Sequence, residues 1–185
     1  MLTHALALAL PFTMITGVAG ATDIAPSRPA ATAGTFMPYR PGSTAITYDP
    51  AVVPAGATAT LTITTTGYGT EVALAVTGLT ANRMYGAHLH TAPCAADPDA
   101  AGPHYQNHPD PVTPSVNPVY ANPRNEIWLD FTADTTGAAT TSVHHGWSFR
   151  PSAPPRSVVL HAEHTHTAAG EAGKAGARLA CLTLP

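Results

Sequence analysis

Alternating hydrophobic and polar residues predict a chain built from short β-strands. Residues 58–65 alternate threonine with alanine, leucine or isoleucine, and residues 71–77 place two valines and a leucine on one face. Successive side chains of a strand project to opposite faces, so this pattern indicates strands with one face in a core and the other in solvent. The Gly-Tyr-Gly sequence at residues 67–69 is a turn signal, and the two segments are expected to be antiparallel.

Six other segments carry a strand pattern, namely residues 45–48, 84–90, 127–132, 138–143, 157–161 and 179–184. The 19 prolines and 15 glycines, together with many threonines and valines, favour strands and structured loops over helices. Eight strands without a convincing helix predict an all-β fold, an eight-stranded antiparallel sandwich or barrel, rather than an α/β arrangement. Two long loops are expected, at residues 91–124 and at the glycine-rich residues 170–176.

The N-terminal residues have the features of a secretory signal peptide. An apolar segment at residues 6–15 precedes a small-residue site, Ala-Gly-Ala at 19–21, after which cleavage is expected. The alternative, a transmembrane helix, requires about 20 apolar residues, whereas this run is short and contains Pro11. We therefore predict that residues 1–21 are a signal peptide and that the mature protein, without a membrane span, is secreted or held at the cell envelope.

The remaining chain divides into a linker and one domain. Residues 22–44 are rich in alanine, proline and threonine without a period, which predicts a disordered linker. Residues 45–185 carry the predicted strands and are long enough for one core. Only 10% of residues are charged, the net charge is -3 and no basic run occurs, so the composition argues against nucleic acid or an anionic membrane as a partner and for a small ligand.

The two cysteines, Cys94 and Cys181, are expected to form a disulfide if the protein is exported. The bond would close a loop of roughly 90 residues and join the loop after residue 90 to the last strand. Two separate buried thiols are the alternative.

Ten histidines are the unusual feature of the composition. His88 and His90 alternate on a predicted strand, so both imidazoles project from the same face and form half of a metal site. Imidazole suits copper, zinc, iron and nickel, so the pair alone does not select the metal. His104, in the long loop, and His161, at the end of a predicted strand, are the candidates to complete the site.

Arg178 is a candidate for binding an anion. It precedes Cys181 by three residues, so a bond between Cys181 and Cys94 would hold it near the loop that carries His104. A cation beside a redox metal attracts a small anion and can orient it by charge and hydrogen bonding.

Four segments in this order resemble the copper/zinc superoxide dismutase family. They are Gly-Ala-His-Leu-His at residues 86–90, Ala-Gly-Pro-His at 101–104, Val-Val-Leu-His at 158–161 and Gly-Ala-Arg-Leu-Ala-Cys at 176–181. Gly-Leu-Thr at 78–80 and Thr-Ala-Asp at 132–134 match it as well. The resemblance spans residues 45–185 and implies a Greek-key β-sandwich.

The resemblance also implies a cofactor, a substrate and the residues that serve them. The cofactor is copper, and its ligands correspond to His88, His90, His104 and His161. The substrate is superoxide, converted to oxygen and hydrogen peroxide as copper cycles between Cu(II) and Cu(I). Arg178 corresponds to the active-site arginine, and His104 to the residue that bridges zinc and copper and carries a proton; Cys94 and Cys181 correspond to the intrasubunit disulfide.

The zinc half of the family's site is altered in this sequence. Arg124 stands where the family has a histidine and Ile127 where it has an aspartate, and neither side chain binds zinc. His108 is left as a candidate ligand, but it lies closer to His104 than the family's second zinc ligand does. We therefore expect a copper-only variant in which a protein group orients His104; the candidates are Glu163, Asp130 and Glu126.

Three interpretations of function remain open at this level. The first is a secreted copper-dependent superoxide dismutase, favoured by Arg178 because storage of a metal needs no anion guide. The second is an extracellular protein of the same fold that stores or delivers copper with little or no dismutase activity. The altered zinc half favours it, as do His164 and His166, which are either solvated, a peripheral metal site or a temporary site for copper. The third is a structural or adhesive sandwich without turnover.

Overall fold

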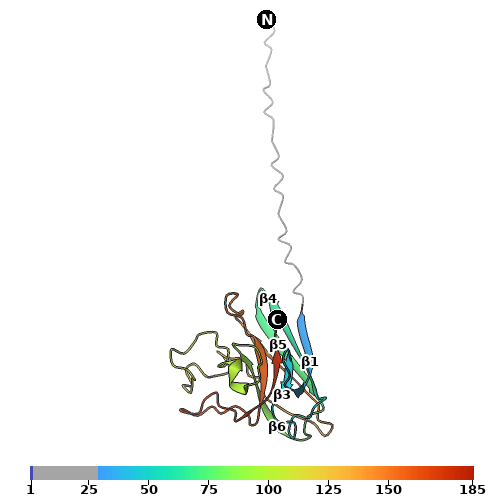
Figure 1. Cartoon of the computed structure of the whole chain (residues 1–185). Helices are drawn as coiled ribbons and strands as arrows, with labels where there is room; N and C mark the ends of the chain where they lie inside the picture. The colour runs from blue at the N-terminus through green and yellow to red at the C-terminus, as the bar shows by residue number, and fades with distance from the viewer. Residues whose placement is uncertain (2–28) are drawn as a thin grey trace.

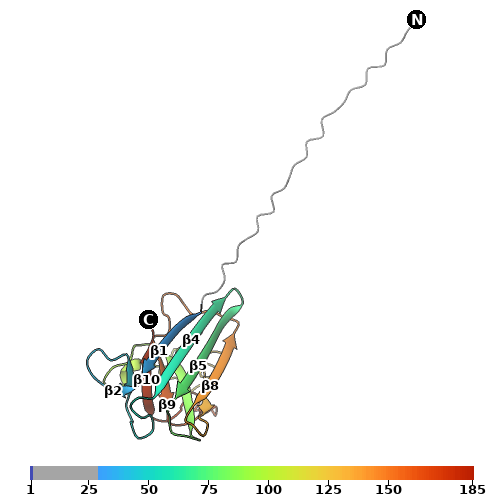
Figure 2. The same cartoon turned by 90° about the vertical axis from the view of Figure 1, so that its right-hand side faces the viewer.

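Residues 29–185 form a sandwich of two β-sheets (Figure 1). The computed structural model describes Met1 and residues 29–185, so the rest of the predicted signal peptide and residues 22–28 of the predicted linker lie outside the described residues. One sheet has the order β1 (Ala30–Thr35), β4 (Thr58–Thr66), β5 (Gly69–Thr77) and β8 (Ala139–His145), as Figure 2 shows from its face. The other has the order β2 (Met37–Pro38), β3 (Ala45–Thr47), β10 (Arg178–Thr183), β9 (Ser157–His161), β6 (Met84–His90) and β7 (Phe131–Thr132).

The core lies between the sheets and follows the alternation seen in the sequence. Leu61 on β4 is paired in register with Leu74 on β5, and both side chains are about 1% exposed. Leu89 and Leu160 face them from the six-stranded sheet and are buried in the same cluster. The predicted all-β sandwich is confirmed, and its strands are antiparallel throughout except for the short parallel pair β2 and β3.

The predicted linker at residues 22–44 is wrong for the part that forms β1 and β2. Strand β1 pairs with β4 over six residues, although its small side chains gave no strand signal. The anchor is Phe36, which is about 1% exposed, and Gly34 lies so close to Ala45 that a Cβ atom would come within 2.7 Å of the alanine side chain. Backbone pairing and this close approach therefore order a segment whose composition is typical of disorder.

The predicted strand at residues 127–132 is also shorter than expected. Regular pairing with β6 is limited to Phe131 and Thr132, because the Asp130 carboxylate accepts the amide N–H of Ala87 at 3.2 Å in place of a backbone carbonyl. Only an isolated bridge between His88 and Trp128 remains upstream. The other predicted strands are confirmed with boundary shifts of one or two residues.

Two long loops cover the outer face of β6 and β9 (Figure 1). The first follows β6 and contains a short 3₁₀ helix at Pro98–Ala101, and the second connects β9 with β10. The loops meet where the Gly170 amide donates to the Val116 carbonyl at 3.2 Å. Because His88 and His90 alternate with core residues of β6, their rings lie on this covered face. No helix among the described residues has the length and apolar character needed to cross a membrane.

Candidate metal centre

Four histidines converge on one point of the covered face. His88 and His90 come from β6, His161 ends the neighbouring strand β9, and His104 reaches the group because its backbone forms an isolated bridge with His90. One ring nitrogen from each lies within 4.8 Å of the others, and all but His104 are buried. The structure therefore brings together the four residues that the sequence singled out.

Two of the rings are oriented by backbone carbonyls. His90 Nδ1 lies 2.9 Å from the carbonyl oxygen of Gly102, and His161 Nδ1 lies 3.5 Å from that of Gly176. A carbonyl only accepts, so in each contact the Nδ1 atom carries the proton. This leaves both Nε2 atoms as acceptors, and they lie 3.2 Å from one another.

His104 is oriented by a buried carboxylate. Its Nδ1 lies 2.8 Å from Glu126 Oε2, which also accepts the indole N–H of Trp128 at 2.7 Å. The other oxygen, Oε1, accepts from Gln106 Nε2 at 2.7 Å. The Glu126 side chain is only 2% exposed, and both of its oxygens accept hydrogen bonds in this network. Because the carboxylate accepts from His104 Nδ1, the ring proton is held at Nδ1 and Nε2 is left for the centre of the group.

His88 is oriented from its opposite nitrogen. Its Nε2 lies 2.6 Å from the Thr165 hydroxyl, which donates to Asp130 Oδ1 at 2.8 Å. The same aspartate accepts the backbone N–H of Thr165 at 2.7 Å, so the three groups form a closed network. The remaining His88 nitrogen, Nδ1, is fully buried and has no hydrogen-bond partner. A buried polar atom without a partner is costly, and a metal ion at the centre of the group would satisfy it.

The donor set therefore fits a divalent transition metal. Each ring presents one unprotonated nitrogen to the centre and fixes the other on a protein group, which is the arrangement of metal-binding histidines. Burial, reinforced by His104 and His161, holds the pKa of His88 and His90 well below the usual 6.5. Burial also lowers the pKa of His161 to about 3. His88, His90 and His161 are thus neutral, as metal binding requires, below the pH at which a free imidazole gains its proton.

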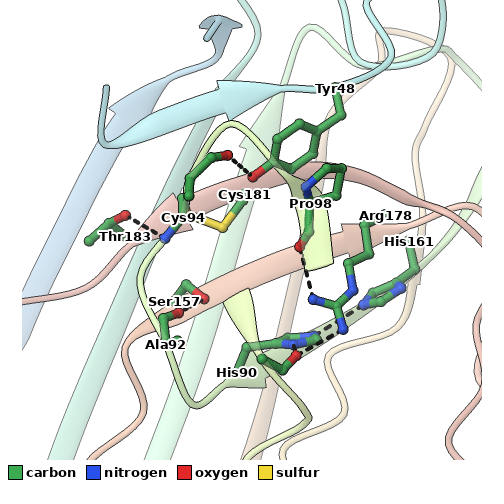
Figure 3. Close-up of a disulfide and its surroundings, with 12 residues drawn as sticks. Tyr48, His90, Ala92, Cys94, Pro98, Ser157, His161, Arg178, Cys181 and Thr183 are labelled. Atoms are coloured by element: carbon green, nitrogen blue, oxygen red, sulfur yellow. Dashed lines mark hydrogen bonds between the residues drawn. A yellow bond between two sulfur atoms is a disulfide. The ribbon is translucent and has the colours of Figure 1, made fainter. Parts of the chain in front are cut away.

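A disulfide fixes the first loop against the strand that carries Arg178 (Figure 3). The predicted bond between Cys94 and Cys181 is present and joins residues 87 apart, which in the chain-entropy account stabilises the fold by about 4 to 5 kcal/mol. The Tyr48 hydroxyl donates to the Ala95 carbonyl at 2.9 Å beside it.

Arg178 is linked to the histidine group through one carbonyl oxygen. Its Nη2 donates to Gly102 at 2.8 Å, the same oxygen that orients His90, and its Nη1 donates to Pro98 at 2.9 Å (Figure 3). Strand pairing adds a second link, because Arg178 lies opposite His161 between β10 and β9. The cation is thereby held at the edge of the four-histidine group.

The other candidate residues lie elsewhere. The backbone of His108 exchanges hydrogen bonds with the Asn125 side chain, and His108 does not join the four-histidine group. The ring of His166 lies between the exposed carboxylates of Glu163 and Glu171, at 3.1 and 3.6 Å, while His164 Nε2 contacts the Phe131 carbonyl. Three carboxylates were considered for orienting ligands. Glu126 is hydrogen-bonded to His104, and Asp130 is linked to His88 through the Thr165 hydroxyl, whereas Glu163 contacts neither histidine.

Three contributors were not identified from the sequence: Gln106, Trp128 and Thr165. The indole N–H of Trp128 donates to Glu126 and helps to hold its carboxylate. The signal available was alternation, since residues 126 and 128 project to the same side of an extended segment. Nothing local marks Thr165, whose role depends on the path of the second loop.

A two-sheet sandwich carrying a buried four-histidine group defines a metal-binding β-sandwich protein. The sequence model of the family described as copper/zinc superoxide dismutase (SODC) matches residues 57–183, and the chain belongs to this family. No curated protein matches the sequence.

The comparison with solved structures shows the fold. The Cu/Zn superoxide dismutase from Brucella abortus is 18% identical, with a TM-score of 0.57 and coverage of 84% of this chain and 100% of that chain. A double mutant of a SOD-like protein from Bacillus subtilis is 16% identical, with a TM-score of 0.48 and coverage of 68% of this chain and 87% of that chain.

The stability of the metal-free protein should fall as the pH drops below about 6.5. Four buried histidines, three in the metal centre and His145 on β8, have lowered pKa values in the folded state, so the unfolded chain binds protons first and is favoured by acid. Each such group contributes up to about 1.4 kcal/mol per pH unit. Urea unfolding between pH 7.5 and 4.5 measures this slope; His161→Asn should make it shallower, and the exposed control His108→Asn should not. Equal slopes for wild type and His161→Asn would contradict the prediction.

Replacing Glu126 by glutamine should weaken Cu(II) binding by roughly 10- to 100-fold. A carboxamide has one acceptor, so its NH₂ group must face either the two donors at the Oε2 position or the Gln106 amide. Gln106 cannot turn to compensate without losing the hydrogen bond that its Oε1 accepts from the Asp110 backbone N–H. Competition with a chelator measures the affinity, and Glu71→Gln, an exposed carboxylate on β5, is the control. An unchanged affinity would mean that Glu126 does not orient His104.

Proposed function

We propose that this protein is a copper-dependent superoxide dismutase of the copper-only kind, converting two superoxide ions and two protons to oxygen and hydrogen peroxide. The observation that carries the proposal is the Gly102 carbonyl, which orients both a candidate metal ligand, His90, and a cation, Arg178. Bound copper would supply the electron transfer, accepting an electron as Cu(II) and returning it as Cu(I).

Arg178 draws superoxide to the site and orients it. Its guanidinium is partly buried, and backbone carbonyls of the first loop accept from both terminal nitrogens, so its position is fixed before the anion arrives. The N–H groups left over can donate charge-assisted hydrogen bonds to the incoming anion. A fixed donor does not have to be reorganised when the substrate binds.

His104 supplies a proton to the product. Its Nδ1–H is held by Glu126, so a second proton on the ring is carried at Nε2, the atom directed into the site. The Glu126 carboxylate stabilises the positive charge that the ring gains with this proton. His104 is also the partly exposed member of the group and lines an open cavity, which gives it access to water for reprotonation.

Zinc has no part in this proposal, because the residues around His104 do not suit it. The His104 nitrogen that would face a zinc ion, Nδ1, is hydrogen-bonded to Glu126 Oε2. The same oxygen also accepts the indole N–H of Trp128. At the positions where the family has further ligands, Arg124 is exposed and Ile127 is buried in the hydrophobic core. The Glu126 carboxylate, held by its hydrogen-bond donors, therefore orients the His104 ring in place of zinc.

We also propose that the protein acts outside the cytoplasm. The signal-like sequence at residues 1–21 is the main support. The Cys94–Cys181 bond is consistent with it, since disulfides persist in oxidising compartments.

Copper storage or delivery is the second candidate function. It is favoured by the four converging imidazoles, which could bind copper without any need for turnover, and by the exposed His166 on the second loop. In that case Arg178 would have only the structural task of bonding the first loop.

Dismutase activity and metal content of the same sample distinguish the candidates. Protein loaded with copper and zinc together should retain one copper and no zinc by mass analysis, and should dismute superoxide with kcat/KM approaching about 10⁹ M⁻¹s⁻¹. Bound copper without activity above that of free copper would support storage, and retained zinc in equal amount would contradict the copper-only proposal.

Arg178→Ala should lower kcat/KM by about 10- to 100-fold while copper remains bound. The loss corresponds to one or two charge-assisted hydrogen bonds to superoxide. Pulse-generated superoxide measures the rate, and the copper absorption spectrum verifies the site. Arg40→Ala, an exposed arginine in the segment before β3, is the matched control. Unchanged turnover in Arg178→Ala would remove its assigned role.

A further inference from the structure

A cavity of about 450 Å³ opens over the metal centre. His104 and His161 line it, together with residues 109–110 and 113–116 of the first loop and residues 173–176 of the second. Superoxide is a diatomic ion, and a liquid water molecule takes up only about 30 Å³. The cavity instead falls in the range of pockets that bind organic ligands, about 300–1,000 Å³.

Three cations line this cavity. Arg178, which lies opposite His161 in the pairing of β10 with β9, is one of them, and Arg150 and Lys174 add two further positive charges from different segments of the chain. Within residues 29–185, neither Arg150 nor Lys174 lies within 4.0 Å of a carboxylate. The Arg150 Nε is buried without a hydrogen-bond partner, and Lys174 is the only lysine in the sequence.

The two carboxylates of the cavity wall balance two of these three charges. Glu126 is buried and already accepts from His104, Trp128 and Gln106. Asp110 accepts the Ser115 hydroxyl at 2.6 Å and a backbone amide at 2.8 Å, which shapes the first loop. Both carboxylates keep their negative charge, and Asp99, outside the lining, lies 3.5 Å from Arg178 Nε. Arg150 and Lys174, which have no carboxylate of the described chain within 4.0 Å, are therefore the cations left to attract an anion.

The lining of the cavity is also partly apolar. Pro109, Pro114 and Val116 line it from the first loop and Ala175 from the second. A lining that combines cations with apolar side chains is complementary to a ligand with an anionic head and a hydrophobic body.

We infer that this cavity binds a small organic carboxylate, with its head group at the cations and its apolar body against the proline-rich wall. Such a ligand would occupy the approach to His104 and His161 and share Arg178 with any inorganic anion. Binding does not require the metal or turnover, so the inference is independent of the proposed dismutase activity.

Calorimetric titration of the metal-free protein with three probes tests it. Benzoate should bind about tenfold tighter than benzamide, which has the same shape without the charge, because charge-assisted hydrogen bonds are lost. It should also bind about tenfold tighter than acetate, which lacks the apolar body. Equal affinity for acetate and benzoate would reduce the site to one for any anion and overturn the proposal, as would equal affinity for benzoate and benzamide or no binding at all.

Two charge-removing variants locate the site. Arg150→Met and Lys174→Met keep the side-chain length and should each weaken benzoate by about tenfold. Arg40→Met removes an arginine that does not line the cavity and should leave the affinity unchanged. Loss of affinity in the Arg40 variant alone would place benzoate elsewhere and overturn the assignment.

Because Lys174 is the sole lysine, acetylation with an amine-reactive reagent provides a second measurement without mutation. Benzoate should slow labelling of Lys174 several-fold, as read by peptide mass mapping, whereas benzamide at the same concentration should not. Labelling that neither probe affects would contradict binding in this cavity. Superoxide assays are not involved, so failure here and failure of the proposed function are told apart.

Discussion

The pairing of β6 with β9 is the constraint on which the candidate metal centre depends. In this register Gly86 lies opposite His161 and His88 opposite Val159, so three imidazoles from two strands project from one face of the six-stranded sheet. The opposite face of the same strands carries Leu89 and Leu160 into the core. A shift by one residue would exchange the two faces and place histidines in the hydrophobic core, which the burial of apolar side chains strongly disfavours. The energy of the core thus fixes the geometry of the site.

The fourth ligand depends on side-chain contacts instead of strand pairing alone. His104 lies in a long loop, and its ring direction is set by Glu126, which Gln106 and Trp128 hold in turn. A buried carboxylate is costly unless several donors surround it, and here three donors do so. Under the copper-only proposal, this network would orient His104 in place of a zinc ion. That a carboxylate can do so follows from its charge, since it favours the same Nδ1–H tautomer and leaves Nε2 free.

The first loop fixes the position of Arg178 and lines the cavity that leads to the metal centre. The disulfide and the bonds from Arg178 to Pro98 and Gly102 hold the start of this loop on β10, as Figure 3 shows. The later part of the loop turns away and, with the second loop, leaves the cationic cavity over the histidines. One loop therefore positions a ligand-orienting carbonyl, fixes the cation and shapes the entrance, which explains why its many prolines are compatible with an ordered structure.

The sequence by itself determined the strands with strong alternation, the all-β class, the disulfide and the four histidines, since alternation, cysteine count and motif order are local properties. The sequence did not decide which of Glu126, Asp130 and Glu163 orients His104. It also predicted disorder for residues that form β1. Only the tertiary structure assigned Glu126 to His104 and Thr165 with Asp130 to His88, because these bonds join residues 22 to 77 positions apart. Their formation depends on the paths of two loops, and no periodicity in the chain encodes a loop's path. The cavity could not be predicted either, because its three cations come from segments that meet only after folding.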